Sequence, residues 1–126
     1  MGQSKIEVYG KKNASLPFHP AVRAGDFVYV SGQVPKDANG NMVAGTIEEE
    51  TRAALEAVKQ VLADAGCTME DVVKVTAFLE DARDFGRYNG VFREFFPEGR
   101  IARSTVEARP VIAAKIEIEC IAYKPL

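Results

Sequence analysis

The chain has 126 residues, of which 47% are hydrophobic and 27% are charged, and its formal net charge is −2. This length predicts a single domain, residues 1–126, and the composition is that of a globular protein with a hydrophobic core. Basic and acidic residues are interspersed, so the sequence lacks the basic patch expected of a nucleic-acid-binding surface.

The hydropathy pattern and the few cysteines and histidines disfavour several other classes of protein. No apolar run approaches the length of a membrane span, and the first residues lack the apolar segment of a signal peptide. Two cysteines, Cys67 and Cys120, are too few for a disulfide framework, so we expect a reduced, cytoplasmic setting. With one histidine and two distant cysteines, we expect no metal site.

Two strands are predicted early in the chain, over Lys5–Tyr9 and Asp26–Val34. Residues 13–24 lie between them and contain two closely spaced prolines, which disfavour a helix and predict an extended, ordered loop. The only histidine, His19, lies in this loop. No serine, cysteine or aspartate stands in a recognisable catalytic relation to it, so we interpret it as a partly exposed loop residue.

The strand over Asp26–Val34 carries an internal glycine, Gly32. A period of two residues assigns to one of its faces Phe27, Tyr29, Ser31 and Gln33. A glycine within a strand usually marks a bulge or the close approach of another group to the backbone. The dipeptide Asn39-Gly40 then predicts a tight turn, followed by a short return strand around residues 42–43.

The strongest helix signal begins at Thr46. Thr46 and Glu49 have the spacing of a capping box, and apolar residues then recur at the three–four spacing of a buried stripe. Gly66 is well placed to end this helix in a left-handed conformation. We interpret Glu48, Glu49 and Glu50 as first-turn acids favoured by the helix dipole rather than as a metal site.

The second half of the chain predicts a strand over Asp71–Leu79 and a helix over about Asp84–Phe96. The aromatic side of this helix is interpreted as part of the core, and it comprises Phe85, Tyr88, Phe92, Phe95 and Phe96. The stretch Ile101–Ile121 then contains two strand-like runs bent around Pro110, and the second run, Lys115–Tyr123, extends slightly past this stretch.

These last two runs carry the residues of greatest chemical interest. In Lys115–Tyr123 apolar and charged residues alternate strictly, which places Glu117 opposite the isoleucines, while Arg103 and Thr105 share a face of the preceding run. If the two runs pair, Arg103 could grip a substrate carboxylate with two parallel bonds, and Glu117 could act as a base or orient a water. The alternative interpretation is an ordinary cross-strand ion pair.

The predicted order is β-β-(β)-α-β-α-β-β, with the uncertain third strand at residues 42–43. It indicates an α/β (α+β) fold, a two-layer sandwich in which two helices cover one face of a mixed sheet. The uncovered face is expected to carry Phe27, Tyr29, Ser31, Thr76, Arg103, Thr105 and Glu117. This face is too aromatic and mixed to be fully solvated, so we expect other subunits to bury it.

Four segments, in this order, resemble the Rid/YjgF family of enamine/imine deaminases. They are Val30–Pro35 (VSGQVP), the pattern of Asn89 and Phe95-Phe96, Ala102–Glu107 (ARSTVE) and Lys115–Ala122 (KIEIECIA). The resemblance covers nearly the whole chain and implies a chorismate-mutase-like (YjgF) fold and a homotrimer with active sites between subunits. It also implies hydrolysis of reactive 2-enamino or 2-imino acids, such as 2-aminoacrylate, to 2-oxo acids and ammonia, without a cofactor.

The resemblance assigns roles to individual residues. Arg103 matches the arginine that binds the substrate carboxylate, and Glu117 matches the glutamate that positions the attacking water. The remaining positions that match the substrate pocket are Ser31, Gly32, Asn89, Phe18 and Thr105. Phe18 stands where many members have tyrosine, and Thr105 where many have cysteine, so both bear on the range of substrates.

Other functions remain open at this stage. The chain could be a non-catalytic module that binds small carboxylates, which would need Arg103 but not Glu117, or a deaminase of a dedicated catabolic pathway. Ribonuclease and chaperone-like roles have been proposed for some relatives. The net charge of −2, the single histidine and the lack of a metal-ligand cluster in the sequence disfavour a nuclease.

Overall fold

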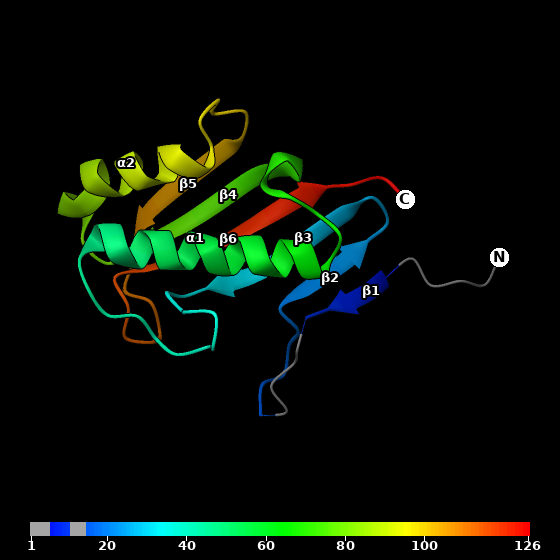
Figure 1. The fold of residues 1–126 in the computed structure, drawn as a ribbon, viewed down its shortest axis with the longest axis horizontal. Helices are drawn as coiled ribbons and strands as arrows, with labels where there is room; N and C mark the ends of the chain where they lie inside the picture. The colour runs from blue at the N-terminus through cyan, green and yellow to red at the C-terminus, as the bar shows by residue number, and fades with distance from the viewer. Residues whose placement is uncertain (1–5, 11–14) are drawn as a thin grey trace.

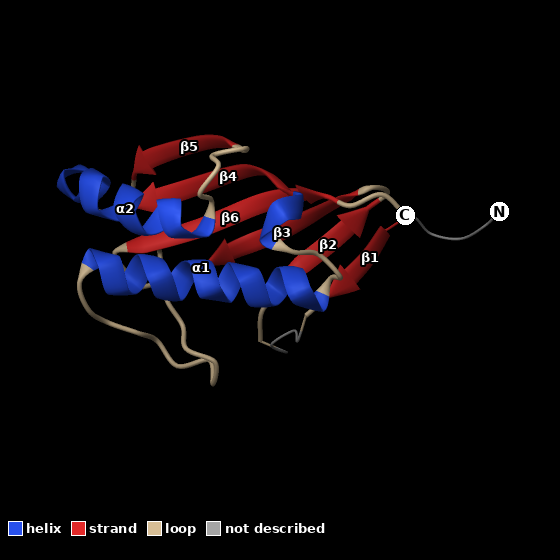
Figure 2. Cartoon of the chain, turned by 45° about the horizontal axis from the view of Figure 1, so that its top comes forward, coloured by secondary structure: helices blue, strands red, loops and turns tan. Residues whose placement is uncertain are grey.

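The computed structural model describes residues 6–10 and 15–126, so the parts of our predictions that concern residues 1–5 and 13–14 lie outside it. One six-stranded sheet is covered on one face by two helices (Figures 1 and 2). The helices are α1 (Ile47–Asp64) and α2 (Phe85–Phe95). The strands are β1 (Ile6–Tyr9), β2 (Ala21–Ala24), β3 (Phe27–Gln33), β4 (Val72–Leu79), β5 (Ala102–Glu107) and β6 (Ile116–Tyr123). The predicted two-layer α/β sandwich is thus confirmed.

The strand order is β1-β2-β3-β6-β4-β5. Strands β4 and β5 are parallel, and the other neighbouring pairs are antiparallel. Short 3-10 turns precede β4 and α2, at η1 (Met69–Asp71) and η2 (Ala82–Asp84). Helix α2 forms the crossover between the two parallel strands, as such a pair requires.

Two of the predicted elements differ from the structure near the start of the chain. Part of the predicted loop is a strand, β2, which begins directly after Pro20, where a missing backbone N–H breaks no bond within the strand. The predicted return strand is only an isolated bridge between Lys36 and Met42, closing a turn in which Gly40 has a φ of +84°. The additional strand expected at residues 42–43 is therefore not part of the sheet, which instead contains β2 between β1 and β3.

The helix signals are confirmed at both ends of α1. The Glu49 amide donates to Thr46 Oγ1 at 3.1 Å and the Thr46 amide donates to Glu49 Oε1 at 2.9 Å, which completes the capping box. Beyond the helix, Gly66 adopts a φ of +79°. In the described part of the chain no helix combines the length and apolarity needed to cross a membrane.

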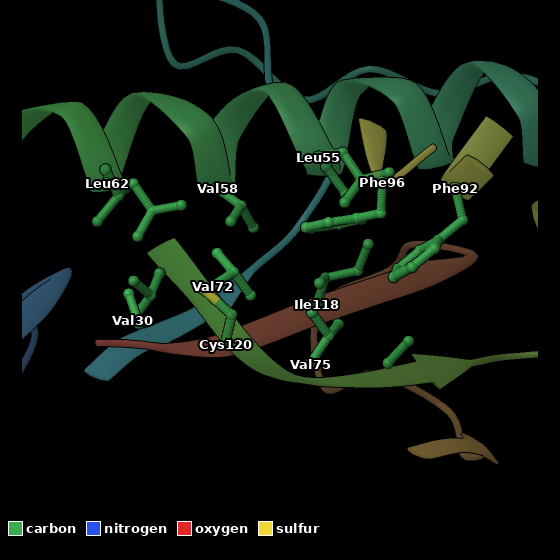
Figure 3. Packing of buried hydrophobic residues seen from close by; sticks show 14 of the residues in the cluster. Val30, Leu55, Val58, Leu62, Val72, Val75, Phe92, Phe96, Ile118 and Cys120 are labelled. Carbon is green, nitrogen blue, oxygen red and sulfur yellow. The ribbon is translucent and has the colours of Figure 1, made fainter. Parts of the chain in front are cut away.

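The helices α1 and α2 lie side by side over the strands (Figures 1 and 2), and the core lies between the helices and the sheet (Figure 3). Helix α1 contributes Leu55, Val58 and Leu62, each at most 1% exposed. The sheet contributes the residues that face them, which include Val30, Val72, Val75, Ile118 and Cys120. These apolar contacts fix which face of each strand is covered by helices.

Strands β5 and β6 do not pair, contrary to the interpretation that placed Arg103 and Glu117 on a shared face. Strand β4 lies between them. Arg103 is in register with buried Val75, so it faces the helices, and Thr105 does the same two residues later. Glu117 lies between buried isoleucines and is in register with Phe78, so it faces the uncovered side. Arg103 and Thr105 were thus predicted on the wrong face of the sheet.

A bulge in β3 explains a second difference. The register of β3 against β6 shifts between Val30 and Gln33, so the strand gains a residue near Gly32. Past the shift the side chains exchange faces, and Gln33 is 5% exposed on the helix side rather than sharing a face with Tyr29. The irregularity that Gly32 predicted is confirmed, but its effect on Gln33 was missed.

Candidate active site

Arg103 lies against a row of aromatic side chains on α2. Its Cζ atom is 5.6 Å from the ring centroid of Phe85, 5.1 Å from that of Tyr88 and 4.7 Å from that of Phe92. The three rings line up because positions i, i+3 and i+7 share one face of a helix. We call Arg103 and these three rings the arginine cluster. A guanidinium held over aromatic faces in this way is stabilised by cation–π attraction.

Thr105 and Tyr88 connect the same strand and helix by a hydrogen bond. The Tyr88 hydroxyl lies 2.8 Å from Thr105 Oγ1, and Tyr88 is completely buried. Burial raises the pKa of the Tyr88 hydroxyl, and the hydrogen bond with Thr105 and the charge of Arg103 only partly oppose this. The hydroxyl therefore stays protonated at physiological pH.

Arg103 has no carboxylate partner among residues 6–10 and 15–126, in contrast to Arg109, whereas Arg100 has only a backbone acceptor. Arg109 lies 4.0 Å from Glu80 with its side chain 88% exposed, and Arg100 donates to the Glu70 carbonyl at 3.3 Å. A depression of about 380 Å³ lies beside Arg103, and Asn89, the predicted pocket asparagine, lines it too.

Ser31, Gly32 and Glu117 form a second group, the glutamate cluster, on β3 and β6. The Glu117 carboxylate lies over Gly32, where a Cβ atom at position 32 would overlap it. The close approach that an internal glycine predicts is thus found, and the approaching group is the glutamate predicted to be catalytic. Glu117 and Ser31 are both half-buried.

The segment that carries Phe18 is fastened to the glutamate cluster through Ser31. The Ser31 hydroxyl donates to the His19 carbonyl at 2.8 Å, and the Ser31 amide donates to the Pro20 carbonyl at the same distance. Phe18 is 50% exposed beside this anchor. The chain thus brings Phe18 and His19 close to Ser31, with His19 acting through its backbone.

The predicted site residues therefore fall into two sets. Arg103, Thr105 and Asn89 lie between β5 and α2, at the edge of the sheet on the helix side. The glutamate cluster lies on the inner strands β3 and β6, with Glu117 on the opposite face, and Phe18 lies in the loop before β2 that Ser31 fastens. One chain brings together the members of each set but not the two sets.

Sequence reasoning missed the part played by Glu50, which it treated only as a first-turn acid. Its side chain is buried, and its two carboxylate oxygens accept the Lys115 amide at 2.8 Å and the Gly45 amide at 3.2 Å, with Lys115 Nζ at 3.4 Å. Glu50 thereby fixes the start of β6, two residues before Glu117. The only signal in the sequence is the run of three glutamates at positions 48–50, of which the capping box uses only Glu49.

Sequence reasoning also placed the α2 aromatics simply in the core. Tyr88, Phe92 and Phe96 are core residues and Phe95 packs against them, but Phe85 is 44% exposed, so its assignment to the core was wrong. Phe85, Tyr88 and Phe92 additionally support Arg103. Among the described residues no group of three or more histidine, cysteine, aspartate or glutamate side chains could hold a metal ion. The arrangement offers an anion site at Arg103 and a potential base at Glu117.

Comparisons with known proteins agree with the sequence motifs. A family model described as Endoribonuclease L-PSP matches residues 11–124. A RutC family protein of Pyrococcus horikoshii is 43% identical over 123 residues, covering 94% of this chain and 98% of that one. The 3-aminoacrylate deaminase RutC of Acinetobacter baylyi is 40% identical over 109 residues, covering 85% and 86%.

Among solved structures, E. coli TdcF with bound serine superimposes with a TM-score of 0.84 at 30% identity, covering 94% of this chain and 98% of that one. The fold, the order of motifs and the extent of these matches point the same way. The chain belongs to the Endoribonuclease L-PSP family, which is the Rid/YjgF family that its motifs resemble.

Proposed function

We propose that the protein hydrolyses small 2-enamino or 2-imino acids to 2-oxo acids and ammonia, at a site completed by two copies of the chain. The observation that carries the proposal is the Arg103 guanidinium, held against three aromatic rings and without a carboxylate partner in the described residues. The similarity to a 3-aminoacrylate deaminase supports the reaction class.

Arg103 is suited to bind the carboxylate of such a substrate. The aromatic rings hold the guanidinium and leave its N–H groups without an acidic partner. A planar carboxylate can accept two parallel bonds from such a fork, and this pairing is stronger than a bond between neutral groups. Because the rings have already restricted Arg103, less side-chain freedom is lost on binding.

Glu117 supplies the second requirement, a base for water. The imine carbon is electrophilic, so a water molecule can add to it while Glu117 accepts a proton from that water. A 2-enamino acid first gains a proton at C3 and so becomes the iminium form that water attacks. Glu117 then passes the proton it took from water to the amino group of the carbinolamine, the C–N bond breaks to release ammonia, and the hydroxyl loses its proton to become the carbonyl of a 2-oxo acid. Gly32 leaves the space that the carboxylate occupies.

Two copies are proposed because Arg103 and Glu117 face opposite sides of the sheet. A small imino acid cannot reach both residues of one chain. The uncovered face exposes large apolar side chains, among them Phe27, Tyr29 and Tyr123 at 40%, 47% and 45% exposure. Exposed apolar surface of this kind marks an interaction site, and we infer a homotrimer in which it is buried.

The test is a coupled assay in which a serine dehydratase generates 2-aminoacrylate and the release of ammonia and pyruvate is followed. We expect the protein to accelerate this release above the spontaneous rate, and Arg103→Ala to lose most of the acceleration. Release at the spontaneous rate would leave a carboxylate-binding module as the better account. Sedimentation of a stable monomer at micromolar concentration would contradict the shared site.

A ribonuclease is not proposed as a second function, although the matching family model bears that description. The formal net charge is −2, and no described feature of the chain offers a phosphate-binding surface beyond single arginines. Incubation with single-stranded RNA under the same conditions is the corresponding check.

A further inference from the structure

Tyr88 contacts both of the site residues on β5. Its ring centroid is 5.1 Å from Arg103 Cζ, and its hydroxyl is 2.8 Å from Thr105 Oγ1. Arg103 and Thr105 are two residues apart and therefore share a face of the strand. Tyr88 itself is completely buried, so it is not a group that a substrate touches.

The ring of Tyr88 is held from both sides. Its centroid is 6.0 Å from that of Phe85 at an interplanar angle of 46°, and 5.6 Å from that of Phe92 at 55°. Such tilted arrangements are favourable for aromatic pairs. A ring that is buried and packed in this way has little freedom to change rotamer, so its position determines that of the groups resting on it.

Either hydroxyl could donate in the bond between Tyr88 and Thr105, and the burial of Tyr88 favours the direction in which Tyr88 donates. Because Tyr88 stays protonated, its O–H needs an acceptor, and Thr105 Oγ1 is the hydrogen-bonding atom that the described residues place beside it. If Tyr88 donates, the Thr105 oxygen is the acceptor and its own hydrogen is available for another group. Thr105 is only half-buried, so that hydrogen can be directed toward a ligand.

We propose that Tyr88 is a positioning residue: its ring orients the Arg103 guanidinium, and its hydroxyl makes Thr105 a hydrogen-bond donor toward the same substrate. This inference rests on the proposed function, since it specifies how that site binds an imino acid. The substrate class it predicts has a carboxylate for Arg103 and a second acceptor beside it for Thr105.

The hydroxyl is tested with Tyr88→Phe, which keeps the ring, together with Thr105→Val and the double variant. We expect each single variant to lower kcat/KM about 2- to 10-fold, as for the loss of one hydrogen bond. Because Tyr88 acts through Thr105, the double variant should lose no more than the poorer single variant. Losses that multiply, or parental kinetics in Tyr88→Phe, would overturn this part.

The ring is tested with Tyr88→Leu, with Val91→Ala as control. We expect Tyr88→Leu to raise KM, and the dissociation constant for pyruvate measured by calorimetry, about 3- to 30-fold. Val91 is 3% exposed on the same helix and has no aromatic ring to hold Arg103, so Val91→Ala should lower Tm and leave both constants unchanged. An equal effect of both variants would mean that only helix packing is involved.

The outcomes separate this inference from the proposed function. If the parent hydrolyses imines but both Tyr88 variants match it, the function stands and the positioning role falls. If the parent binds pyruvate without hydrolysing imines, the function falls, and weaker pyruvate binding by Tyr88→Leu still supports the role of the ring. A parent that neither hydrolyses imines nor binds pyruvate contradicts both.

Discussion

The arginine cluster and the glutamate cluster are built in different ways. Arg103 is held by side chains, between a strand and three rings of α2, on the helix-covered face. Glu117 lies against the backbone of a glycine in a bulged strand, on the uncovered face. One is a fixed cation in aromatic surroundings, and the other is a carboxylate beside an open surface.

This comparison shows which parts of the candidate site are formed when a single chain folds. Each cluster is already arranged within one chain, so in the shared site that we propose a second copy need only bring the two together. Arranged groups of this kind react without the cost of ordering them at the moment of reaction. Variants that affect one cluster should therefore change either substrate binding or the chemical step, and not both alike.

Substitution of Arg103 should have the largest effect. Loss of one partner of a shielded charge pair costs about 2–5 kcal/mol, so Arg103→Ala should lower kcat/KM by roughly thirty- to several-thousand-fold. Arg103→Lys keeps the charge but loses the planar fork, and it should restore little. Steady-state kinetics with imines, after circular dichroism to verify folding, provide the measurement.

Arg109→Ala and Arg100→Ala are the matched controls for this change. Among the described residues it is Arg103 whose guanidinium lies over Phe85, Tyr88 and Phe92, so both controls should keep near-parental activity. Activity retained in Arg103→Ala but lost in one of the controls would show that the anchor is elsewhere. If all three variants keep parental activity, no arginine anchors the substrate.

Gly32→Ala should disrupt the glutamate cluster alone. A Cβ atom at this position would displace the Glu117 carboxylate, so we expect kcat to fall about 100-fold or more, the value of a positioned acid–base group. KM should change little because Arg103 is untouched. Gly90→Ala is the control: no atom lies within 4 Å of its added carbon, and it should gain up to about 1 kcal/mol of stability. Parental kcat in Gly32→Ala would contradict the assignment.

Glu50→Gln should weaken the contacts that fix the start of β6, two residues before Glu117. One amide oxygen cannot replace both carboxylate oxygens, so either the Lys115 or the Gly45 amide loses its acceptor in a buried place. We expect a loss of about 1–3 kcal/mol in the free energy of unfolding, measured by urea denaturation. Glu48→Gln removes the same charge from the same turn and should stay within about 0.5 kcal/mol. Equal losses would assign the effect to the helix dipole instead.

The smallest expected effect is a pH dependence on the helix side of β6. Burial raises the pKa of the Cys120 thiol to about 12, with smaller contributions from Cys67 and Glu119. The unfolded thiol ionises near its ordinary pKa of 9.0, so this contribution to stability is complete below pH 9 and is lost as the pH rises toward 12.

Cys120→Ala lacks this ionisation, so the stability difference between parent and variant should shrink by up to about 1.4 kcal/mol per pH unit in this range. Denaturation curves at pH 8 and at pH 10 measure it. A constant difference would show that the thiol is not protected by the core.

Local signals were sufficient to predict most of the fold. The capping box at Thr46 and the alternation in β6 each specify an element without reference to distant residues. The β5–β6 pairing on which a shared face for Arg103 and Glu117 depended is not found, because β4 lies between the two strands and α2 makes β4 and β5 parallel neighbours. Periodicity assigns residues to the two faces of a strand but does not say which face the helices cover.

The residues of the candidate site were harder to place for the same reason. The sequence motifs indicate Arg103 and Glu117 individually, but their surroundings depend on contacts between elements. Tyr88 has the pattern of any core aromatic, and its contacts with Arg103 and Thr105 depend on how α2 packs on β5. Gln33 was assigned to the wrong face because a strict two-residue period does not include the extra residue that a bulge adds.

The most direct test of the central claim mixes two inactive variants, Arg103→Ala and Glu117→Ala. If each site takes Arg103 from one subunit and Glu117 from another, random exchange in a trimer restores about a quarter of the sites, and imine hydrolysis should return to about that fraction of the parental rate. If both residues act within one chain, every site in the mixture lacks one of them. Activity that stays at the level of the separate variants, with subunit exchange verified by mass spectrometry, would contradict a site shared between copies.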